Sequence, residues 1–391
     1  MNSIDLTRAG ETPSMADVRA GLQDAVREDP RLFQQRLGAQ PFPVLENGRA
    51  LFAHVAEADQ VLLHHWIYAL ESAHPFERVP GTDLWLLEIE IQHEARVEYK
   101  VEVVRGEEHR LVQDPLNPNL AQDPFGANSV ATGFGYLDPE WAEEHPGTRR
   151  GEVVERRLRS DVFGDVRPLS IYLPARFRET RRYPLLVVHD GLDYLRFASL
   201  KNILDNLIHR LEIPPMVVAM TQSPNRVVEY AADEKHARFL ADELVPLLEN
   251  EFPLLEGPQD RALLGASFGA VASLHTSWVR PGVFGKLLLQ SGSFAFTDIG
   301  DHDRGPLFDP VVEFVNAFRA EPSAPEQIFL SCGTYESLIY YNRSMLPVLQ
   351  GVGSDVRLVE AQDGHNWENW RDRLREGLTW LFAGPLWMVY E

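Results

Sequence analysis

A serine framed by small residues, Gly265-Ala266-Ser267-Phe268-Gly269, is the feature that most constrains how this chain can fold. It lies between a run at 261–264 that is typical of a short buried strand and a run at 270–275 that is typical of the first turns of a helix. A strand that enters a helix through a tight G-x-S-x-G turn holds the serine hydroxyl clear of the sheet. The helix directs its first N–H groups toward the same place, which favours a developing oxyanion. Ser267 is therefore predicted to be a nucleophile. The alternative is a turn of small residues without chemistry, which would not require a serine.

An activated serine needs a histidine as its base, and only three histidines follow Ser267 in the chain. His275 falls two turns into the predicted helix and is interpreted as structural, and His302 lies in a polar loop. His365 instead follows a predicted strand at 356–360 and directly precedes a helix. The loop between the last strand and the last helix is where the base of an α/β-hydrolase lies. His365 is therefore predicted to be the base.

The carboxylate that orients this histidine is expected at the end of the preceding strand. Glu336 follows the predicted strand at 327–333 and is the first carboxylate there. It would accept the Nδ1 hydrogen of His365 and stabilise the imidazolium. The alternative is that Glu336 only stabilises the start of the next helix. Asp355 and Asp363 compete for the role, but each is too near His365 in sequence to approach its ring from a neighbouring strand.

Two N–H donors are expected to form an oxyanion hole. One is the backbone N–H of Phe268, the residue after the nucleophile. The other is expected from Gly191 or Leu192, which follow the strongly apolar run at 184–188, because a glycine lets backbone approach a ligand closely. An alternative interpretation makes the polar residues of this loop metal ligands, but their close spacing matches no zinc or calcium frame, and no metal or cofactor is expected. These polar residues are His189, Asp190 and Asp193.

With these residues in view, the C-terminal half resembles the enterochelin (iron–siderophore) esterase family, within a broader serine esterase superfamily. The resemblance covers most of residues 151–384, and the matching stretches are 186–191, 225–230, 239–246, 265–269, 290–294 and 363–367. It implies an α/β-hydrolase fold with a parallel central sheet and the same catalytic triad. It also implies that Arg226 and Glu229 face the cleft, and Trp367 is expected to contact substrate with them.

The N-terminal half shows four short runs rich in β-branched and aromatic residues, at 52–55, 61–68, 84–91 and 97–104. Turn signals separate them, which predicts a small β-sandwich. The segment that follows at 114–118 resembles the immunoglobulin-like domain that precedes esterases of this family. Such a module can bind carbohydrate through an aromatic platform, Trp66 or Trp85, although aromatics at such positions more often belong to the core or a domain interface.

The predicted organisation has three parts: an N-terminal helical segment at 1–40, the immunoglobulin-like sandwich at 41–135 and the catalytic domain at 136–391. The apolar spacing before the sandwich favours an amphipathic helix, broken in two by Pro30, with Ser14 and Asp17 forming a capping box.

The composition limits the partners and the compartment. A formal charge of −21 argues against nucleic acid or an anionic membrane surface as a partner. The first residues lack the apolar core of a secretory signal, and no apolar run is long enough to span a bilayer. The single cysteine, Cys332, excludes an internal disulfide. A cytoplasmic location is expected, and a homo-oligomer remains open.

These observations lead to a hypothesis of a serine ester hydrolase that acts through an acyl-enzyme on a siderophore or a related small-molecule ester. A ferric catecholate siderophore is anionic, so the cleft would need local positive charge, for which Arg226 is the best candidate. Alternatives with the same machinery are a feruloyl or acetyl esterase acting on carbohydrate, and an acyltransferase. An alternative of another class is a non-catalytic carbohydrate-binding or scaffold protein with a hydrolase fold.

Overall fold

The computed structural model describes residues 14–39, 41–298 and 302–384. The residues on which the expectation about a secretory signal rests lie outside this part of the chain. The chain divides into two compact units. The N-terminal unit runs to Leu137 and includes Gln362–Gly364, and the catalytic unit comprises Asp138–Ala361 and the residues from His365 onward.

The N-terminal unit begins with two helices, α1 (Met15–Glu28) and α2 (Pro30–Ala39). The Ser14 side chain accepts a hydrogen bond from the Asp17 N–H at 3.1 Å, which caps α1 as the sequence predicts. Pro30 starts α2 rather than continuing α1, because proline fits the first turn of a helix but not its interior. Apolar residues of α1 pack into the same core as the first of the two sheets that follow.

The two sheets of the N-terminal unit form the predicted sandwich. Within the described residues one sheet has the strand order β1-β2-β6-β5, and the other has the order β4-β3-β7-β10-β9 with β8 paired to β7. The Phe52 and Tyr99 rings meet edge to face at 5.1 Å and join the two sheets. The strands are β1 (Val44–Glu46), β2 (Arg49–Val55), β3 (Gln60–His65), β4 (Ala73–Pro75), β5 (Glu77–Arg78), β6 (Leu84–Glu90), β7 (Arg96–Arg105), β8 (Glu108–Val112), β9 (Leu120–Asp123) and β10 (Gly126–Thr132).

The two tryptophans considered as carbohydrate platforms differ in exposure. Trp85 is buried in β6, and its indole N–H donates to the Ala56 carbonyl at 2.8 Å, so it belongs to the core. The Trp66 side chain is exposed at the end of β3. Carbohydrate binding by this unit stays a prediction, and of the two residues only Trp66 presents a face to solvent.

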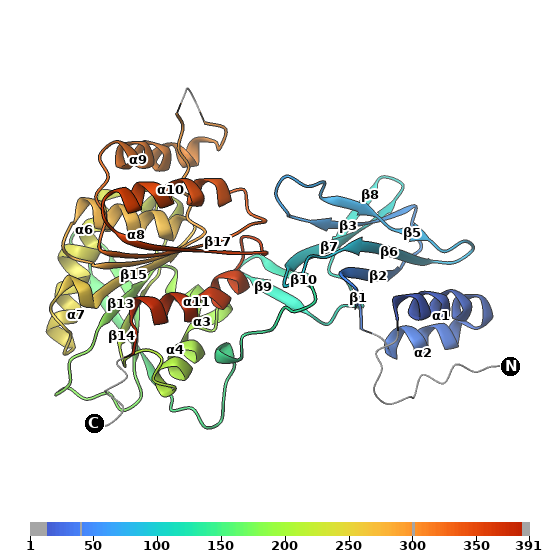
Figure 1. Ribbon diagram of the computed structural model, residues 1–391, viewed down its shortest axis with the longest axis horizontal. Coiled ribbons are helices and arrows are strands. Elements are labelled where there is room, and N and C mark those ends of the chain that lie inside the picture. Colours follow the sequence, from blue (N-terminus) through green and yellow to red (C-terminus); the bar gives the residue numbers. More distant parts are fainter. Residues whose placement is uncertain (1–13, 40, 299–301, 385–391) are drawn as a thin grey trace. The chain divides into compact units, whose positions relative to one another are not determined.

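The catalytic unit is built on one mixed sheet (Figure 1). Across the described residues its strand order is β11-β12-β14-β13-β15-β16-β17-β18. Strand β12 pairs antiparallel with both neighbours, and all later pairs are parallel. This is the predicted α/β-hydrolase arrangement. The strands are β11 (Glu152–Arg159), β12 (Val166–Leu173), β13 (Leu185–Val188), β14 (Val217–Thr221), β15 (Arg261–Ala266), β16 (Lys286–Gln290), β17 (Gln327–Gly333) and β18 (Asp355–Ala361).

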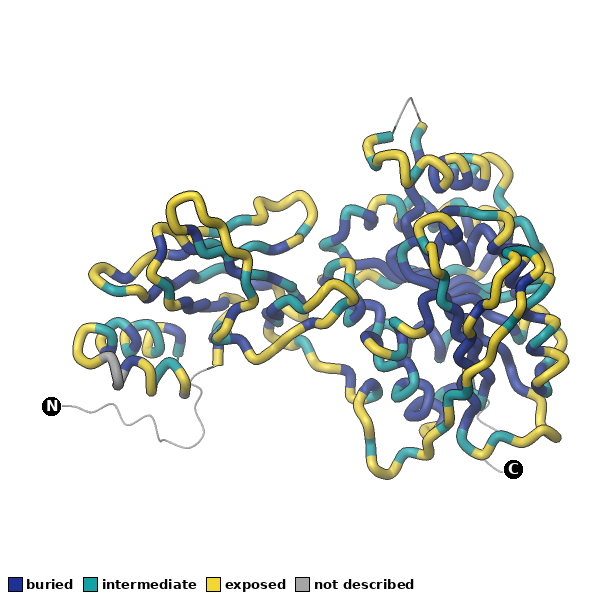
Figure 2. The backbone as a smooth tube through the Cα atoms, turned by 180° about the vertical axis from the view of Figure 1, so that it is seen from behind, coloured by how far each residue is buried: buried dark blue, intermediate teal, exposed yellow. Residues whose placement is uncertain are grey.

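Helices cover both faces of this sheet. Figure 1 shows α3, α4 and α11 on one face and α8, α9 and α10 on the other, and two separate apolar cores correspond to these faces. Because both faces are covered, the central strands read as continuous apolar runs, and Figure 2 shows them almost entirely buried. The helices are α3 (Gly191–Phe197), α4 (Leu200–His209), α5 (Arg226–Glu229), α6 (Glu234–Arg238), α7 (Val245–Glu251), α8 (Phe268–Val279), α9 (Asp309–Ala320), α10 (Ile339–Gly351) and α11 (Trp367–Leu381). No helix in the described ranges is long and apolar enough to cross a bilayer.

Because the core around the sheet is tightly packed, truncating a side chain of β15 is expected to destabilise the protein. Leu263 is fully buried there, so Leu263→Ala is expected to lower the free energy of unfolding of the catalytic unit by about 2–5 kcal/mol, through lost burial and an unfilled cavity. Leu307→Ala is the matched control, because that side chain is exposed and the change should be within about 0.5 kcal/mol. Urea denaturation measures both. Equal effects of the two variants would contradict this account of the core.

Candidate active site

The backbone at Ser267 has the strained geometry of a nucleophile elbow. Ser267 connects β15 to α8 with φ 57° and ψ −119°, a conformation that a residue with a side chain rarely adopts. The Ser267 N–H donates to the Gln290 carbonyl at 2.9 Å, which anchors the turn to the neighbouring strand. A Cβ on Gly265 would lie 2.3 Å from the carbonyl carbon of Gly269. The small residues of the pentapeptide therefore permit the close passage of strand and helix.

The structure brings His365 and Glu336 together. The distance from His365 Nδ1 to Glu336 Oε2 is 2.6 Å. Because an ionised carboxylate only accepts hydrogen bonds, Nδ1 carries the hydrogen, and Nε2 is left able to accept a proton. The Glu336 side chain is 1% exposed and that of His365 is 39% exposed. The histidine therefore keeps an open side while its partner is shielded from water.

The buried carboxylate of Glu336 is fully provided with donors. Its Oε1 atom accepts hydrogen bonds from the Ser291 hydroxyl at 2.6 Å and from the Gly333 N–H at 2.7 Å. Burying a carboxylate is costly unless donors replace water, and these contacts supply such donors. Ser291 in turn accepts a hydrogen bond from the Trp370 indole at 2.9 Å, and the Trp370 ring stands edge-on to His365.

Ser267 and His365, the predicted nucleophile and base, lie at the same edge of the sheet but are not joined directly. Ser267 Oγ is 3.1 Å from Ser293 Oγ, and among the described residues it makes no hydrogen bond to His365. Hydrogen bonds between catalytic groups are often long in unliganded enzymes and tighten when substrate binds. His365 thus contacts Glu336, whereas the Ser267 hydroxyl contacts the hydroxyl of Ser293.

The competing acids have other surroundings. Asp363 Oδ1 accepts the Gly364 N–H at 2.7 Å and lies 3.3 Å from Arg96 Nη1, with all three residues in the N-terminal unit. Asp355 is the first residue of β18 and so lies at the opposite edge of the sheet from His365. Glu336 is the carboxylate that the structure places on the imidazole.

The two other histidines after the nucleophile are occupied elsewhere. His275 is buried in α8 against the Phe314 ring, and burial lowers its pKa to about 4. His302 Nε2 lies 3.0 Å from the Asp309 carboxylate.

The expected oxyanion donors lie at the starts of two helices. Phe268 is the first residue of α8, and Gly191 and Leu192 are the first residues of α3. N–H groups in the first turn of a helix have no acceptor within it, so they are able to serve a ligand. Packing is a reason for glycine at 191 that the sequence did not indicate, because a Cβ there would lie 2.2 Å from the Met220 Cβ. Close packing on β14 requires it, whether or not a ligand approaches.

Arg226 pairs with Asp190. Its Nε and Nη2 atoms donate to Asp190 Oδ2 at 3.1 and 2.8 Å. Burial acts to lower the pKa of Arg226, but the Asp190 carboxylate outweighs this effect and the pKa is raised. The Arg226 side chain is 37% exposed. Part of this side chain therefore remains accessible at the edge of the sheet where Asp190 follows β13.

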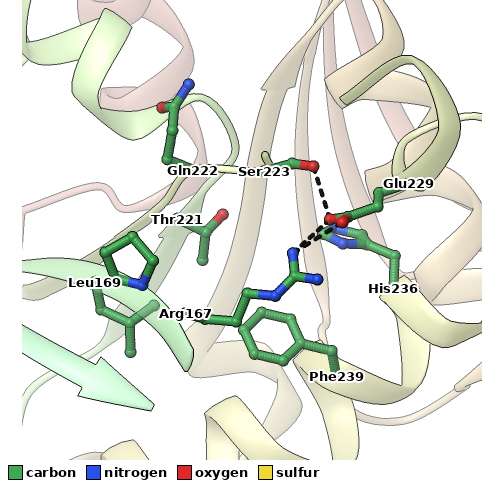
Figure 3. Close-up of a pocket in the computed structure, with 9 residues that line it drawn as sticks. Arg167, Leu169, Thr221, Gln222, Ser223, Glu229, His236 and Phe239 are labelled. Carbon is green, nitrogen blue, oxygen red and sulfur yellow. Dashed lines mark hydrogen bonds and ion pairs between the residues drawn. The ribbon is translucent and has the colours of Figure 1, made fainter. Parts of the chain in front are cut away.

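Glu229 is held inside the protein by Arg167 (Figure 3). Arg167 Nη1 donates to the two carboxylate oxygens of Glu229 at 2.8 and 2.9 Å, and the Ser223 hydroxyl donates to it at 2.7 Å. Glu229 is 7% exposed, and the cavity beside this pair has a volume of about 10 Å³, room for one water molecule. The expectation that Glu229 faces the cleft does not agree with this geometry, because the last turn of α5 directs its carboxylate inward onto β12.

Trp367 is also largely enclosed. It begins α11 and meets the rings of Tyr194 at 5.2 Å and Trp370 at 4.8 Å, both edge to face. With 9% of the residue exposed, its main contacts are with the core beneath the site. Contact with substrate stays a prediction for this residue and for Arg226.

The three residues considered as metal ligands, His189, Asp190 and Asp193, form hydrogen bonds with other side chains. His189 Nε2 lies 3.0 Å from His236 Nε2 in a buried pair, and burial lowers the pKa of His189 to about 4. Asp190 binds Arg226, and Asp193 accepts a hydrogen bond from Gln222 at 3.2 Å. In the described ranges, no group of three or more histidine, cysteine or acidic side chains is arranged to hold a metal ion.

The residues of the turn after β16 were not among those expected at the site. Ser291 contacts Glu336 and Ser293 contacts Ser267, and Trp370 on α11 donates a hydrogen bond to Ser291. A signal for the turn was present, because Gln290-Ser291-Gly292-Ser293 is a polar run that directly follows an apolar strand at the carboxyl edge of the sheet.

Comparison with known proteins agrees with this fold. The chain is 25% identical over 347 residues to the iron(III) enterobactin esterase of Dickeya dadantii (strain 3937), covering 79% of each protein. The enterobactin esterase of Shigella flexneri, solved in the presence of enterobactin, superimposes with a TM-score of 0.73 at 20% identity, covering 90% of this chain and 98% of that one. A ferulic acid esterase from Anaeromyces mucronatus, in complex with ferulic acid, reaches a TM-score of 0.52 at 20% identity and covers 62% of this chain and 94% of that one.

A family model described as "Putative esterase" matches residues 160–381, which is more than half of the chain and includes Ser267, Glu336 and His365. The chain therefore belongs to this esterase family and is a carboxylic ester hydrolase.

Proposed function

We propose that the protein hydrolyses esters through an acyl-enzyme formed on Ser267, with His365 as the base and Glu336 as the acid. The observation that carries this proposal is the 2.6 Å contact between His365 Nδ1 and the buried Glu336 carboxylate, at the edge of the sheet where the strained Ser267 turn lies. This contact fixes the tautomer in which Nε2 accepts the serine proton.

The reaction proceeds in two halves. His365 Nε2 takes the proton of Ser267 as Oγ attacks the ester carbonyl, and the oxyanion that forms is met by N–H groups of Phe268 and of Gly191 or Leu192. The imidazolium, stabilised by Glu336, gives its proton to the leaving alcohol, and the acyl-enzyme remains. Water then attacks the acyl-enzyme with His365 again as base, which releases the acid and restores Ser267.

We propose a siderophore or a related anionic small molecule as the ester substrate. The relatives named enterobactin esterases match the N-terminal unit as well as the catalytic unit, whereas the ferulic acid esterase covers 62% of the chain. The partly exposed side chain of Arg226 supplies positive charge beside the carboxyl edge of an otherwise acidic protein. A feruloyl or acetyl esterase is the second candidate, supported by the likeness of the catalytic fold alone. Hydrolysis by the wild type of a ferric siderophore ester, compared with feruloyl and acetyl esters, tests the choice.

The first prediction concerns the nucleophile. Ser267→Ala is expected to lower kcat on a short p-nitrophenyl ester by about 10³-fold or more, because the acyl-enzyme cannot form. A thermal melt should show that the variant remains folded. Ser354→Ala is the matched control, because it removes a buried hydroxyl bonded to the Pro325 carbonyl at the amino edge of the sheet. Turnover at the wild-type rate by purified Ser267→Ala would overturn the assignment.

The second prediction separates the candidate acids. Glu336→Gln keeps the shape of the side chain but removes the charge that stabilises the imidazolium, so kcat should fall by about 10²–10⁴-fold. Asp363→Asn should have a much smaller effect, since Asp363 bonds Gly364 and Arg96 rather than the imidazole. Steady-state kinetics on the same ester measures both. The reverse ranking would place the acid in the histidine loop.

The third prediction tests the cation. Arg226→Ala should raise KM for an iron-loaded siderophore ester by about 10–100-fold, as the loss of a charge-assisted contact would, and hardly change KM for a small neutral ester. Asp190→Asn should lower KM for the siderophore ester or leave it unchanged, because it frees the guanidinium from its present partner.

Glu229→Gln serves as the control for this prediction. It should lower the melting temperature by weakening the buried pair with Arg167, with no selective effect on the siderophore ester. Equal losses on the charged and neutral esters after Arg226→Ala would make Arg226 structural.

A further inference from the structure

The turn that follows β16, Ser291-Gly292-Ser293, lies between the nucleophile and the acid. Strand β16 pairs with β15 on one side and with β17 on the other, so its carboxyl end is next to both the Ser267 turn and the loop of Glu336. Ser291 and Ser293 are almost completely buried. Buried polar side chains generally form hydrogen bonds, so the partners of these two hydroxyls are informative.

Ser293 contacts the nucleophile residue twice. Its hydroxyl lies 3.1 Å from Ser267 Oγ, and its backbone N–H donates to the Ser267 carbonyl at 3.3 Å. The first contact acts on the reactive hydroxyl and the second on the strained backbone that presents it. Ser291, one residue removed, donates to the acid instead, so the two hydroxyls of one turn serve the two ends of the catalytic array.

The turn itself is held rigidly. Asn342 on α10 is fully buried, and its side chain makes a reciprocal pair with Gly292, accepting the N–H at 3.1 Å and donating to the carbonyl at 2.9 Å. Ser291 has φ 46°, a strained value for a residue with a side chain, and such a conformation persists where the surroundings fix it. The Ser293 hydroxyl is therefore presented from a fixed support.

We infer that Ser293 is a positioning residue that sets the rotamer of the Ser267 hydroxyl, an inference that rests on the proposed function. A serine side chain has three staggered rotamers. Contact with Ser293 directs Oγ toward β16, and therefore toward the side of the sheet where Glu336 and His365 follow β17 and β18. When Ser267 turns its single hydrogen toward His365 Nε2, Ser293 donates its own hydrogen to Ser267 Oγ. The hydrogen bond between the two hydroxyls is then kept, with Ser293 as donor and Ser267 as acceptor.

The test measures the reactivity of Ser267 apart from substrate binding. A neutral fluorophosphonate labels activated serines, and its second-order rate constant is compared with kcat and KM on a short p-nitrophenyl ester. Ser293→Ala should lower the labelling rate and kcat by about 10-fold, which corresponds to a hydrogen bond of about 1.4 kcal/mol, with KM within about twofold of wild type. Ser354→Ala, which removes a buried hydroxyl far from the site, should keep the wild-type labelling rate.

Two further variants separate the hydroxyl from the packing. Ser293→Thr and Ser293→Val add the same bulk, but only threonine keeps a hydroxyl, so threonine should label faster than valine by about the same 10-fold factor, with similar melting temperatures. Labelling of Ser293→Ala at the wild-type rate, or equal rates for the threonine and valine variants, would overturn the inference. Undiminished labelling of Ser267→Ala would instead overturn the proposed function, so the two failures are distinguishable.

Discussion

The parallel pairing of β15, β16, β17 and β18 is the constraint on which the site depends. The register places Ala266 opposite Gln290, and Gln290 opposite Ser331, so neighbouring strands end at nearly the same level. The loops that leave this edge carry Ser267 after β15, Ser291 and Ser293 after β16, Glu336 after β17 and His365 after β18. Residues nearly a hundred positions apart in sequence come to the same edge in this way. The alignment is maintained by backbone hydrogen bonds, which do not depend on the side chains that perform the chemistry.

Glu336 and Arg226, two charged side chains at the carboxyl edge of the sheet, each have a partner. Two donors and an imidazole replace water around the buried Glu336 carboxylate. Arg226 and Asp190 form a second pair nearby, in which the arginine side chain is partly exposed.

The sequence was sufficient for the groups that follow strands directly. Apolar runs end where the sheet ends, so the polar residues that follow each run mark its carboxyl edge, and Ser267, Glu336 and His365 follow β15, β17 and β18 at that edge. Their catalytic roles stay predictions. The sequence was not sufficient for Glu229, because whether the last residue of the short helix α5 points outward or inward depends on Arg167, which is contributed by a distant strand. The sequence also marks a glycine at 191 without revealing that packing against Met220 is what requires it. Contacts between distant segments decide such cases, and periodicity does not report them.

The single cysteine of the chain lies beside this edge. Cys332 is buried near the end of β17, and burial together with the Glu336 carboxylate raises the pKa of its thiol. A thiol that is both shielded and protonated reacts slowly with alkylating reagents. Because the chain holds no second thiol, the rate at which such a reagent modifies the protein reports local opening around Cys332. The catalytic edge thus carries its own kinetic probe of local opening, without any engineered label.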